Sequence, residues 1–246
     1  MNAADAAARP VFADKDSARE HVWAALREAQ AAAFPFPVRG RIPNFAGAGD
    51  AARRLLEQPA IADARRLKVN PDAPQRPFRE AALRRGIELL LPTPRLGAGF
   101  RRLDPARIPA DALRTAATIA GAERWGEPVP VPDLPRVDAV VTGSVAVTPG
   151  GRRCGKGHGY GDLEFAVLRQ LGHPPVPVLT AVHPLQIVGD FPAAPHDLPL
   201  ETIVTPDEAI AIQRPAPAPA GIDWSVLDGD DLEAMPVLAE LRRAVG

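Results

Sequence analysis

The chain has 246 residues, a hydrophobic fraction of 46% and a formal net charge of −1. That length fits one large domain, alone or with an appendage, and so many apolar side chains exclude a wholly disordered chain. No apolar run approaches the length of a membrane span, and the first thirty residues lack the charged start and apolar stretch of a secretory signal.

The first half of the chain predicts helices that alternate with strands. Ser17, followed three positions later by Glu20, forms a capping box that opens a helix reaching about residue 33, before Pro35 and Pro37. Further elements follow in chain order: a helix over residues 50–58, a strand over 67–70, a helix over 79–85 and a strand over 87–91. The last of these strands is largely apolar, which is typical of a buried parallel sheet.

The second half repeats this alternation. It predicts a helix over 111–122, strands over 137–141 and 145–147, a glycine-rich loop over 149–161, a helix beginning near Asp162, and strands over 176–182 and 202–204. Such an order predicts a three-layer α/β sandwich with a mainly parallel sheet. We expect this domain to span residues 1–212, followed by a stiff Pro/Ala linker over 213–221 and a tail over 222–246 with a short helix.

The glycine-rich loop is the strongest local signal for chemistry. Glycines at 155, 157, 159 and 161 alternate between an apolar strand and a helix, so successive N–H groups are free to turn inward and bind an anion. Lys156 adds a positive charge for a phosphate, and Asp162 is placed to cap the helix or to hold Mg²⁺ beside that phosphate. The loop therefore predicts a phosphate site. The alternative is a flexible connection in which Asp162 is only a helix cap.

The basic residues are lopsided, with 26 Arg and three Lys, at positions 15, 68 and 156. A GC-rich coding sequence accounts for the excess of arginine, and against that background a retained lysine is informative. The balance of acidic and basic residues gives no reason to expect a nucleic-acid partner. The single cysteine, Cys154, cannot form an internal disulfide, and we expect a cytoplasmic protein that does not enter a membrane.

The glycine-rich loop resembles the signature loop of the 5-formyltetrahydrofolate cyclo-ligases, also called methenyltetrahydrofolate synthetases. The matching residues are Arg153, Gly155, Gly157, Gly159, Tyr160 and Asp162. Lys156 stands where the family usually has Arg or Tyr, and Gly161 replaces a second tyrosine. Other segments resemble the branch named methenyltetrahydrofolate synthetase domain-containing proteins, over residues 41–45, 68–75, 92–96, 143–147 and 155–164. The similarity runs in the same order over roughly residues 15–210, which is more specific than one loop.

The resemblance implies a fold like that of the ribose-phosphate isomerase and CoA-transferase group, and the use of ATP with Mg²⁺. In the family, ATP phosphorylates the oxygen of the N5-formyl group, N10 attacks the activated carbon, and phosphate leaves to give 5,10-methenyltetrahydrofolate. The site residues that the resemblance implies are Lys15 and Arg19 with Arg153, Gly155, Gly157, Gly159 and Tyr160 for the nucleotide, Asp162 for Mg²⁺, and Lys156 with Tyr160 for catalysis.

The part of the site that would hold the pterin is less closely matched. The family uses a glutamate after an early strand, for which Asp72 is an approximate substitute. With Gly161 in place of a tyrosine, stacking falls to another aromatic residue such as Phe45, and His183 ends an apolar strand where ligands often bind. Core packing of Phe45 and a structural role for His183 are the alternatives.

Three functions follow from these observations. The first is an ATP- and Mg²⁺-dependent cyclo-ligase that converts 5-formyltetrahydrofolate to 5,10-methenyltetrahydrofolate. The second keeps the ATP-dependent ring closure but acts on a non-folate N-acyl or amide substrate. The third is a non-catalytic nucleotide-binding module. The partner in the first two is a small molecule, and the sequence does not indicate an oligomeric state.

Overall fold

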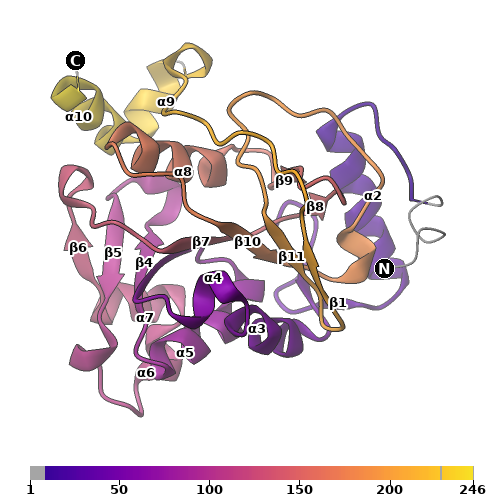
Figure 1. The fold of residues 1–246 in the computed structure, drawn as a ribbon, viewed down its shortest axis with the longest axis horizontal. Helices are drawn as coiled ribbons and strands as arrows, with labels where there is room; N and C mark the ends of the chain where they lie inside the picture. The colour runs from indigo at the N-terminus through magenta and orange to yellow at the C-terminus, as the bar shows by residue number, and fades with distance from the viewer. Residues whose placement is uncertain (1–8, 228, 246) are drawn as a thin grey trace.

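An eight-stranded sheet organises the chain in the computed structural model, which describes residues 9–227 and 229–245 (Figure 1). Five neighbouring strands are parallel: β11 (Thr202–Val204), β10 (Val178–Ala181), β7 (Ala139–Thr142), β3 (Arg66–Val69) and β4 (Glu88–Pro92). Antiparallel strands flank them: β12 (Ala209–Ala211) at one edge, and β5 (Phe100–Leu103) and β6 (Glu127–Val129) at the other. The predicted α/β fold with a mainly parallel sheet is confirmed.

Helices cover both faces of this sheet, as Figure 1 shows. One layer contains α3 (Ala48–Leu56), α4 (Pro59–Ala62), α5 (Arg76–Arg84), α6 (Leu113–Ala116) and α7 (Ile119–Trp125). The other contains α8 (Tyr160–Gln170), α9 (Gly229–Ala234) and α10 (Pro236–Val245). Successive residues of a strand point to opposite faces. Leu89 and Leu91 of β4 therefore pack in the first hydrophobic core, which lies between the sheet and the layer of α3 to α7. Leu90 packs in the second core, which lies between the sheet and the layer of α8 to α10. Burial on both faces is the reason that the three central residues of this strand are all leucine.

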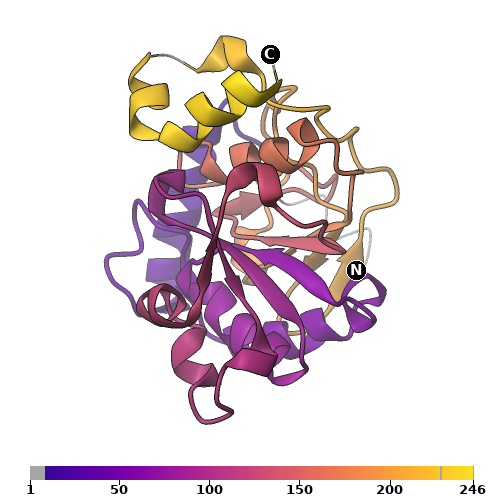
Figure 2. The same ribbon diagram turned by 90° about the vertical axis from the view of Figure 1, so that its left-hand side faces the viewer.

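A smaller third core fixes the first helix, α2 (Lys15–Glu28), at one end of the sheet (Figure 2). Val22, Trp23 and Leu26 of α2 pack against Ala146 and Cys154. The last two belong to the antiparallel pair β8 (Ala146–Val147) and β9 (Arg153–Cys154), and a second pair, β1 (Ala32–Ala33) and β2 (Asn44–Phe45), follows α2. This packing brings α2 beside the glycine-rich loop, whose predicted span over 149–161 contains β9.

Several boundaries differ from those that the sequence predicts. The N-cap of α2 is Asp14 rather than Ser17, because the Asp14 carboxylate accepts a hydrogen bond from the Ser17 N–H at 2.7 Å. The helix predicted over 111–122 is two helices, since α6 ends at Ala116 and Thr118 caps α7 by accepting from the Gly121 N–H at 2.9 Å. The sequence also missed β5 and β6, where charged residues and proline mask the strand pattern.

The segment over 213–246 follows the edge strand β12. Residues 213–221 contain no helix or strand, and the tail predicted to hold one short helix contains two, α9 and α10, separated at Met235. Met235, Leu238 and Leu241 are buried in the same core as α8. The segment beyond residue 221 is therefore packed on the domain rather than extended from it.

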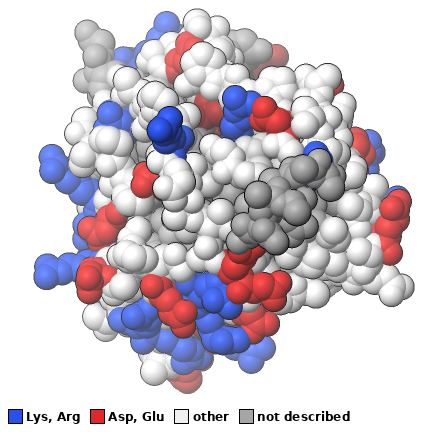
Figure 3. Space-filling view, turned by 45° about the vertical axis from the view of Figure 1, so that its right-hand side comes forward, with Lys and Arg blue, Asp and Glu red and all other residues white. Residues whose placement is uncertain are grey.

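The surface carries charges of both signs. On the face shown in Figure 3, acidic and basic side chains are interspersed. Among the helices of residues 9–227 and 229–245, none is both long enough and apolar enough to cross a membrane.

The sheet also determines where the polar residues meet. Parallel strands end at a common edge, and a crevice forms there where the connections from two neighbouring strands diverge. The neighbours β3 and β7 have this relation, because β3 leads to β4 on one side while β7 leads to β10 on the other. Asn70 follows β3 and Gly143 follows β7, so both lie at this edge.

Candidate active site

A cavity of about 250 Å³ lies at this edge of the sheet. Its walls come from α2, from the turns after β3, β4 and β7, and from the part of the glycine-rich loop that begins at Arg153. Ten of the twelve residues that the sequence predicts for the site line it: Lys15, Arg19, Asp72, Arg153, Gly155, Lys156, Gly157, Gly159, Tyr160 and Asp162. Residues far apart in the chain thus form one polar site.

Glycine occupies these loop positions for two different structural reasons. Gly157 and Gly159 adopt φ of 109° and 66°, a region that other residues rarely occupy, and Gly159 is the N-cap of α8. Gly155 and Gly161 instead make room for a guanidinium: a Cβ at these positions would lie 2.8 and 3.2 Å from Nη2 of Arg153. The replacement of the family's second tyrosine by Gly161 therefore accompanies the buried position of Arg153.

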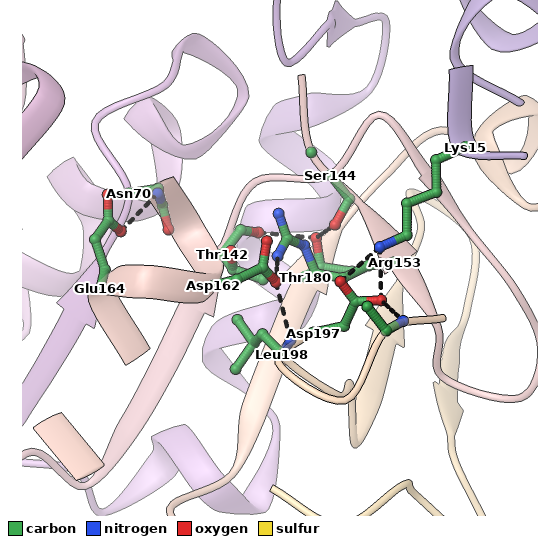
Figure 4. Close-up of polar contacts among 12 residues, drawn as sticks. Lys15, Asn70, Thr142, Ser144, Arg153, Asp162, Glu164, Thr180, Asp197 and Leu198 are labelled. Atoms are coloured by element: carbon green, nitrogen blue, oxygen red, sulfur yellow. Dashed lines mark hydrogen bonds and ion pairs between the residues drawn. The ribbon is translucent and has the colours of Figure 1, made fainter. Parts of the chain in front are cut away.

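Arg153 and Asp162 form the centre of the site (Figure 4). Nη1 of Arg153 donates to Oδ1 of Asp162 at 2.6 Å, and the Leu198 N–H donates to the same oxygen at 2.9 Å. The Arg153 side chain is only 3% exposed, so it acts as a fixed cation beneath the loop. The hydrogen bonds that described residues make to Asp162 use Oδ1, which leaves Oδ2 on a carboxylate whose orientation is fixed.

Two cations of α2 face the loop from the other side. Nζ of Lys15 donates to both carboxylate oxygens of Asp197, at 2.5 and 2.6 Å. Nε of Arg19, one helical turn further along α2, donates to the carbonyl of Gly155 at 2.6 Å. Together with Arg153, these side chains surround the glycine-rich loop at the N-terminus of α8, an arrangement that favours phosphate.

A larger cavity of about 660 Å³ adjoins the first. Asp72 and Lys156 line both cavities, with Nζ of Lys156 3.6 Å from Oδ1 of Asp72. The larger cavity is lined by exposed Phe34 and by basic residues that include Arg41 and Arg76. An aromatic molecule that carries negative charge fits this lining.

A buried arginine holds Asp72 in place. Nη1 of Arg79 donates to the carbonyls of Asn70 and Asp72, at 2.7 and 2.9 Å, and its Nε donates to the carbonyl of Ala117 at 2.9 Å. Burial lowers the pKa of Arg79 to about 10, which still leaves it charged at neutral pH. The backbone at the junction of the two cavities is therefore rigid.

A family model supplies the observation that decides the relationship of this chain to known proteins. The model of the 5-formyltetrahydrofolate cyclo-ligase family matches residues 11–206. The chain belongs to this family. The resemblance inferred from the sequence motifs is confirmed.

Relatives named methenyltetrahydrofolate synthase domain-containing protein are similar to this cyclo-ligase family member over most of its length. Methenyltetrahydrofolate synthase domain-containing protein of Mus musculus is 44% identical over 235 residues, which cover 93% of this chain and 63% of the relative. The Homo sapiens protein of the same name is 37% identical over 241 residues, covering 95% and 63%. The chain thus spans less than two thirds of the length of these relatives.

A solved structure agrees with the fold. The NMR structure of Aquifex aeolicus 5,10-methenyltetrahydrofolate synthetase aligns with a TM-score of 0.51 over 81% of this chain and 93% of that one. The two sequences are 19% identical, so this likeness supports the fold alone.

Phe45 and His183, which the sequence also predicts to contact the substrate, line neither cavity of this cyclo-ligase family member. Phe45 is 2% exposed in the first core, and its ring contacts that of His183 edge-on at 6.1 Å between centroids. Nδ1 of His183 accepts from the Leu185 N–H at 3.2 Å as part of a capping box with Gln186, and burial lowers the pKa of His183. Phe45 therefore packs in a hydrophobic core and His183 caps a short helix, which are the structural roles given above as alternatives to substrate contact.

Lys68 and Glu164 form a buried ion pair that the sequence did not predict. Nζ of Lys68 bonds to Oε2 of Glu164 and donates to Oδ1 of Asn70 at 2.9 Å, while Nδ2 of Asn70 donates to the same Glu164 oxygen at 3.1 Å. The two charged side chains are 0% and 5% exposed. The signal in the sequence was Lys68 itself, a lysine between Leu67 and Val69 of a strand.

The donor set also indicates how a metal ion would bind. Among the described residues, no group of three or more His, Cys, Asp and Glu side chains is arranged to hold a metal. Mg²⁺ commonly binds through one or two carboxylates together with substrate phosphates and water. Asp162 beside a phosphate site fits this mode of binding. The described residues do not fit a metal site made of protein ligands alone.

Proposed function

We propose that this chain is an ATP- and Mg²⁺-dependent cyclo-ligase that converts 5-formyltetrahydrofolate to 5,10-methenyltetrahydrofolate. The observation that carries the proposal is the junction of two cavities at Asp72 and Lys156. One cavity has the cations and the helix N-terminus of a phosphate site, and the other has the size and lining for an aromatic anion. Membership of the cyclo-ligase family supports the same reaction type.

The residues of the smaller cavity fit a nucleotide with Mg²⁺. Lys15, Arg19 and Arg153 supply positive charge around the loop of Gly155, Gly157 and Gly159, and Asp162 supplies a carboxylate for the metal. When bound, ATP supplies the phosphoryl group that turns the formyl oxygen into a leaving group.

Lys156 and Tyr160 are the residues that we assign to catalysis. Lys156 lines both cavities, so its ammonium is placed to stabilise negative charge that develops between them. Tyr160 begins α8, lines the smaller cavity and stacks on His158 at 5.8 Å between ring centroids. Asp72, held by Arg79, is assigned to the substrate.

The charges on the face shown in Figure 3 are of both signs and interspersed, which favours a small molecule over a nucleic acid as the partner. The buried thiol of Cys154 suits the cytoplasm.

Incubation of the chain with ATP, Mg²⁺ and 5-formyltetrahydrofolate tests the proposal. We expect absorbance of the methenyl product to rise only when all three are present. Nucleotide consumption without methenyl product would instead support ring closure on a non-folate N-acyl or amide substrate. Binding of ATP without its consumption by any such substrate would support a non-catalytic nucleotide-binding module.

Asp162→Asn tests the metal assignment. Asparagine keeps an acceptor for the Leu198 N–H but removes the charge, so we expect the Mg²⁺ concentration for half-maximal activity to rise at least about tenfold. A Mg²⁺ titration of the variant beside wild type measures this. Asp190→Asn is the matched control, because Asp190 is half exposed and pairs with Arg152 outside both cavities. An unchanged titration for Asp162→Asn would leave that carboxylate as a partner of Arg153 only.

A further inference from the structure

A third cavity, of about 200 Å³, continues from the phosphate site along α8. The two cavities share His158, Gly159, Asp162 and His196. Beyond these residues the lining becomes apolar, with Leu163 and Ala166 of α8 on one side. A ligand with its anionic end at the N-terminus of α8 therefore has an apolar space beside it.

The opposite wall comes from a part of the chain outside the family match, which ends at residue 206. It consists of Ile222, Asp223, Val226, Leu227 and Met235. Two hydrogen bonds tie this segment to the end of α8: the Ile222 N–H donates to Oε1 of Gln170 at 3.1 Å, and Nε of Arg169 donates to the carbonyl of Pro219 at 3.2 Å. Met235 is 3% exposed in the core beneath. The wall is thus fixed before any ligand binds.

Val226 distinguishes this wall from ordinary core packing. Its side chain is 51% exposed although it lines the cavity with other apolar groups. Asp223 beside it accepts from the backbone N–H and the hydroxyl of Ser225, at 3.1 and 2.6 Å, which fixes a carboxylate at the rim. An apolar slot with a carboxylate at its edge matches a flat heterocyclic base attached to a sugar with hydroxyl donors.

We propose that the wall of Ile222, Asp223, Val226, Leu227 and Met235 completes the nucleotide site, with the base of ATP between α8 and Val226 and the ribose near Asp223. The proposal rests on the proposed function, because it extends the same phosphate site. It assigns a ligand-binding role to residues beyond those that the family model matches.

Equilibrium binding of ATP and of inorganic tripolyphosphate, each with Mg²⁺, tests this inference. We expect wild type to bind ATP more tightly than tripolyphosphate, since only ATP has a base. Val226→Asn keeps the size and neutral charge of the side chain but makes it polar, so we expect ATP affinity to fall about tenfold and tripolyphosphate affinity to stay unchanged. Val11→Asn is the matched control, because Val11 is 72% exposed and lines none of these three cavities.

Each outcome decides a separate point. Equal binding of ATP by wild type and Val226→Asn, or equal wild-type affinity for ATP and tripolyphosphate, would overturn the base site and leave the phosphate site intact. Failure of wild type to bind either ligand would overturn the proposed function together with this inference. A thermal melt of Val226→Asn that matches wild type establishes that the variant is folded, and Val226→Thr, an isosteric change, should give a smaller loss in the same direction.

Discussion

Lys156→Ala should lower the turnover number of the cyclo-ligase reaction by about 100- to 1,000-fold, the usual cost of removing one group that stabilises charge in a transition state. Lys156 is the loop cation that lines both the phosphate cavity and the larger cavity. Its Nζ lies 3.6 Å from Asp72 and its side chain is 38% exposed, so truncation should change folding little. Steady-state kinetics at saturating ATP, with a thermal melt of the same sample, separate the two effects.

Two further variants make this test specific. Lys156→Arg keeps the charge in a different shape, and we expect it to recover part of the lost turnover. Arg53→Ala removes a cation of α3 that is 73% exposed and pairs with Asp50, and it should leave turnover unchanged. Near-normal turnover of Lys156→Ala would remove the lysine from the catalytic assignment while leaving the phosphate site to the other cations.

Lys68→Met should lower the free energy of unfolding by about 3–5 kcal/mol, because it leaves the buried carboxylate of Glu164 without its counter-ion. Methionine has a similar length, so the loss reflects charge rather than a cavity. The double variant Lys68→Met/Glu164→Gln should regain most of the stability, since a glutamine still accepts from Nδ2 of Asn70. Denaturant unfolding of the three proteins measures these differences.

A control comes from the same strand. Arg66 also pairs with a glutamate, Glu88, but its side chain is 31% exposed and Glu88 keeps a second partner in Arg102 at 2.7 Å. Arg66→Met should therefore cost much less than Lys68→Met. Equal stability of Lys68→Met and wild type would mean that Glu164 does not need its counter-ion.

The loss of stability in Lys68→Met should also depend on pH. Burial raises the pKa of Glu164, and the charge of Lys68 opposes that rise. A carboxyl group with a raised folded-state pKa contributes stability that is present below its unfolded pKa and is lost as the pH rises through the folded-state pKa. Without Lys68 the rise is larger, so we expect the deficit of Lys68→Met to grow as the pH increases from the ordinary carboxyl range toward neutrality. Glu164→Gln in the same background should abolish this trend.

The elements of the sheet and the loop were accessible from sequence because their signals are local. A largely apolar run such as 87–91 predicts a buried strand, and alternating glycines between a strand and a helix predict a phosphate loop. The antiparallel strands β5 and β6 were missed because Arg101 and Arg102 face partly outward and pair with distant groups, which local periodicity does not reveal.

The roles of individual site residues depended on contacts between distant parts of the chain. Phe45 and His183 have the residue types of a ligand site, yet their neighbours in space place both away from the cavities. Lys68 was conspicuous in sequence but had no assigned role, because its partner Glu164 is 96 positions away. Burial makes that pair important, and burial is a property of the packed sheet and helix together.

The sequence by itself determined the α/β alternation, the glycine-rich loop between a strand and a helix, and the family, since these rest on contiguous patterns and ordered motifs. Only the tertiary structure decided that Asp72 and Lys156 join two cavities, that Arg153 occupies the space left by two glycines, and that the segment after residue 221 lines a third cavity beside α8. Cavities and buried charges arise where elements from different parts of the chain pack against one another, and no local sequence pattern specifies which elements pack together.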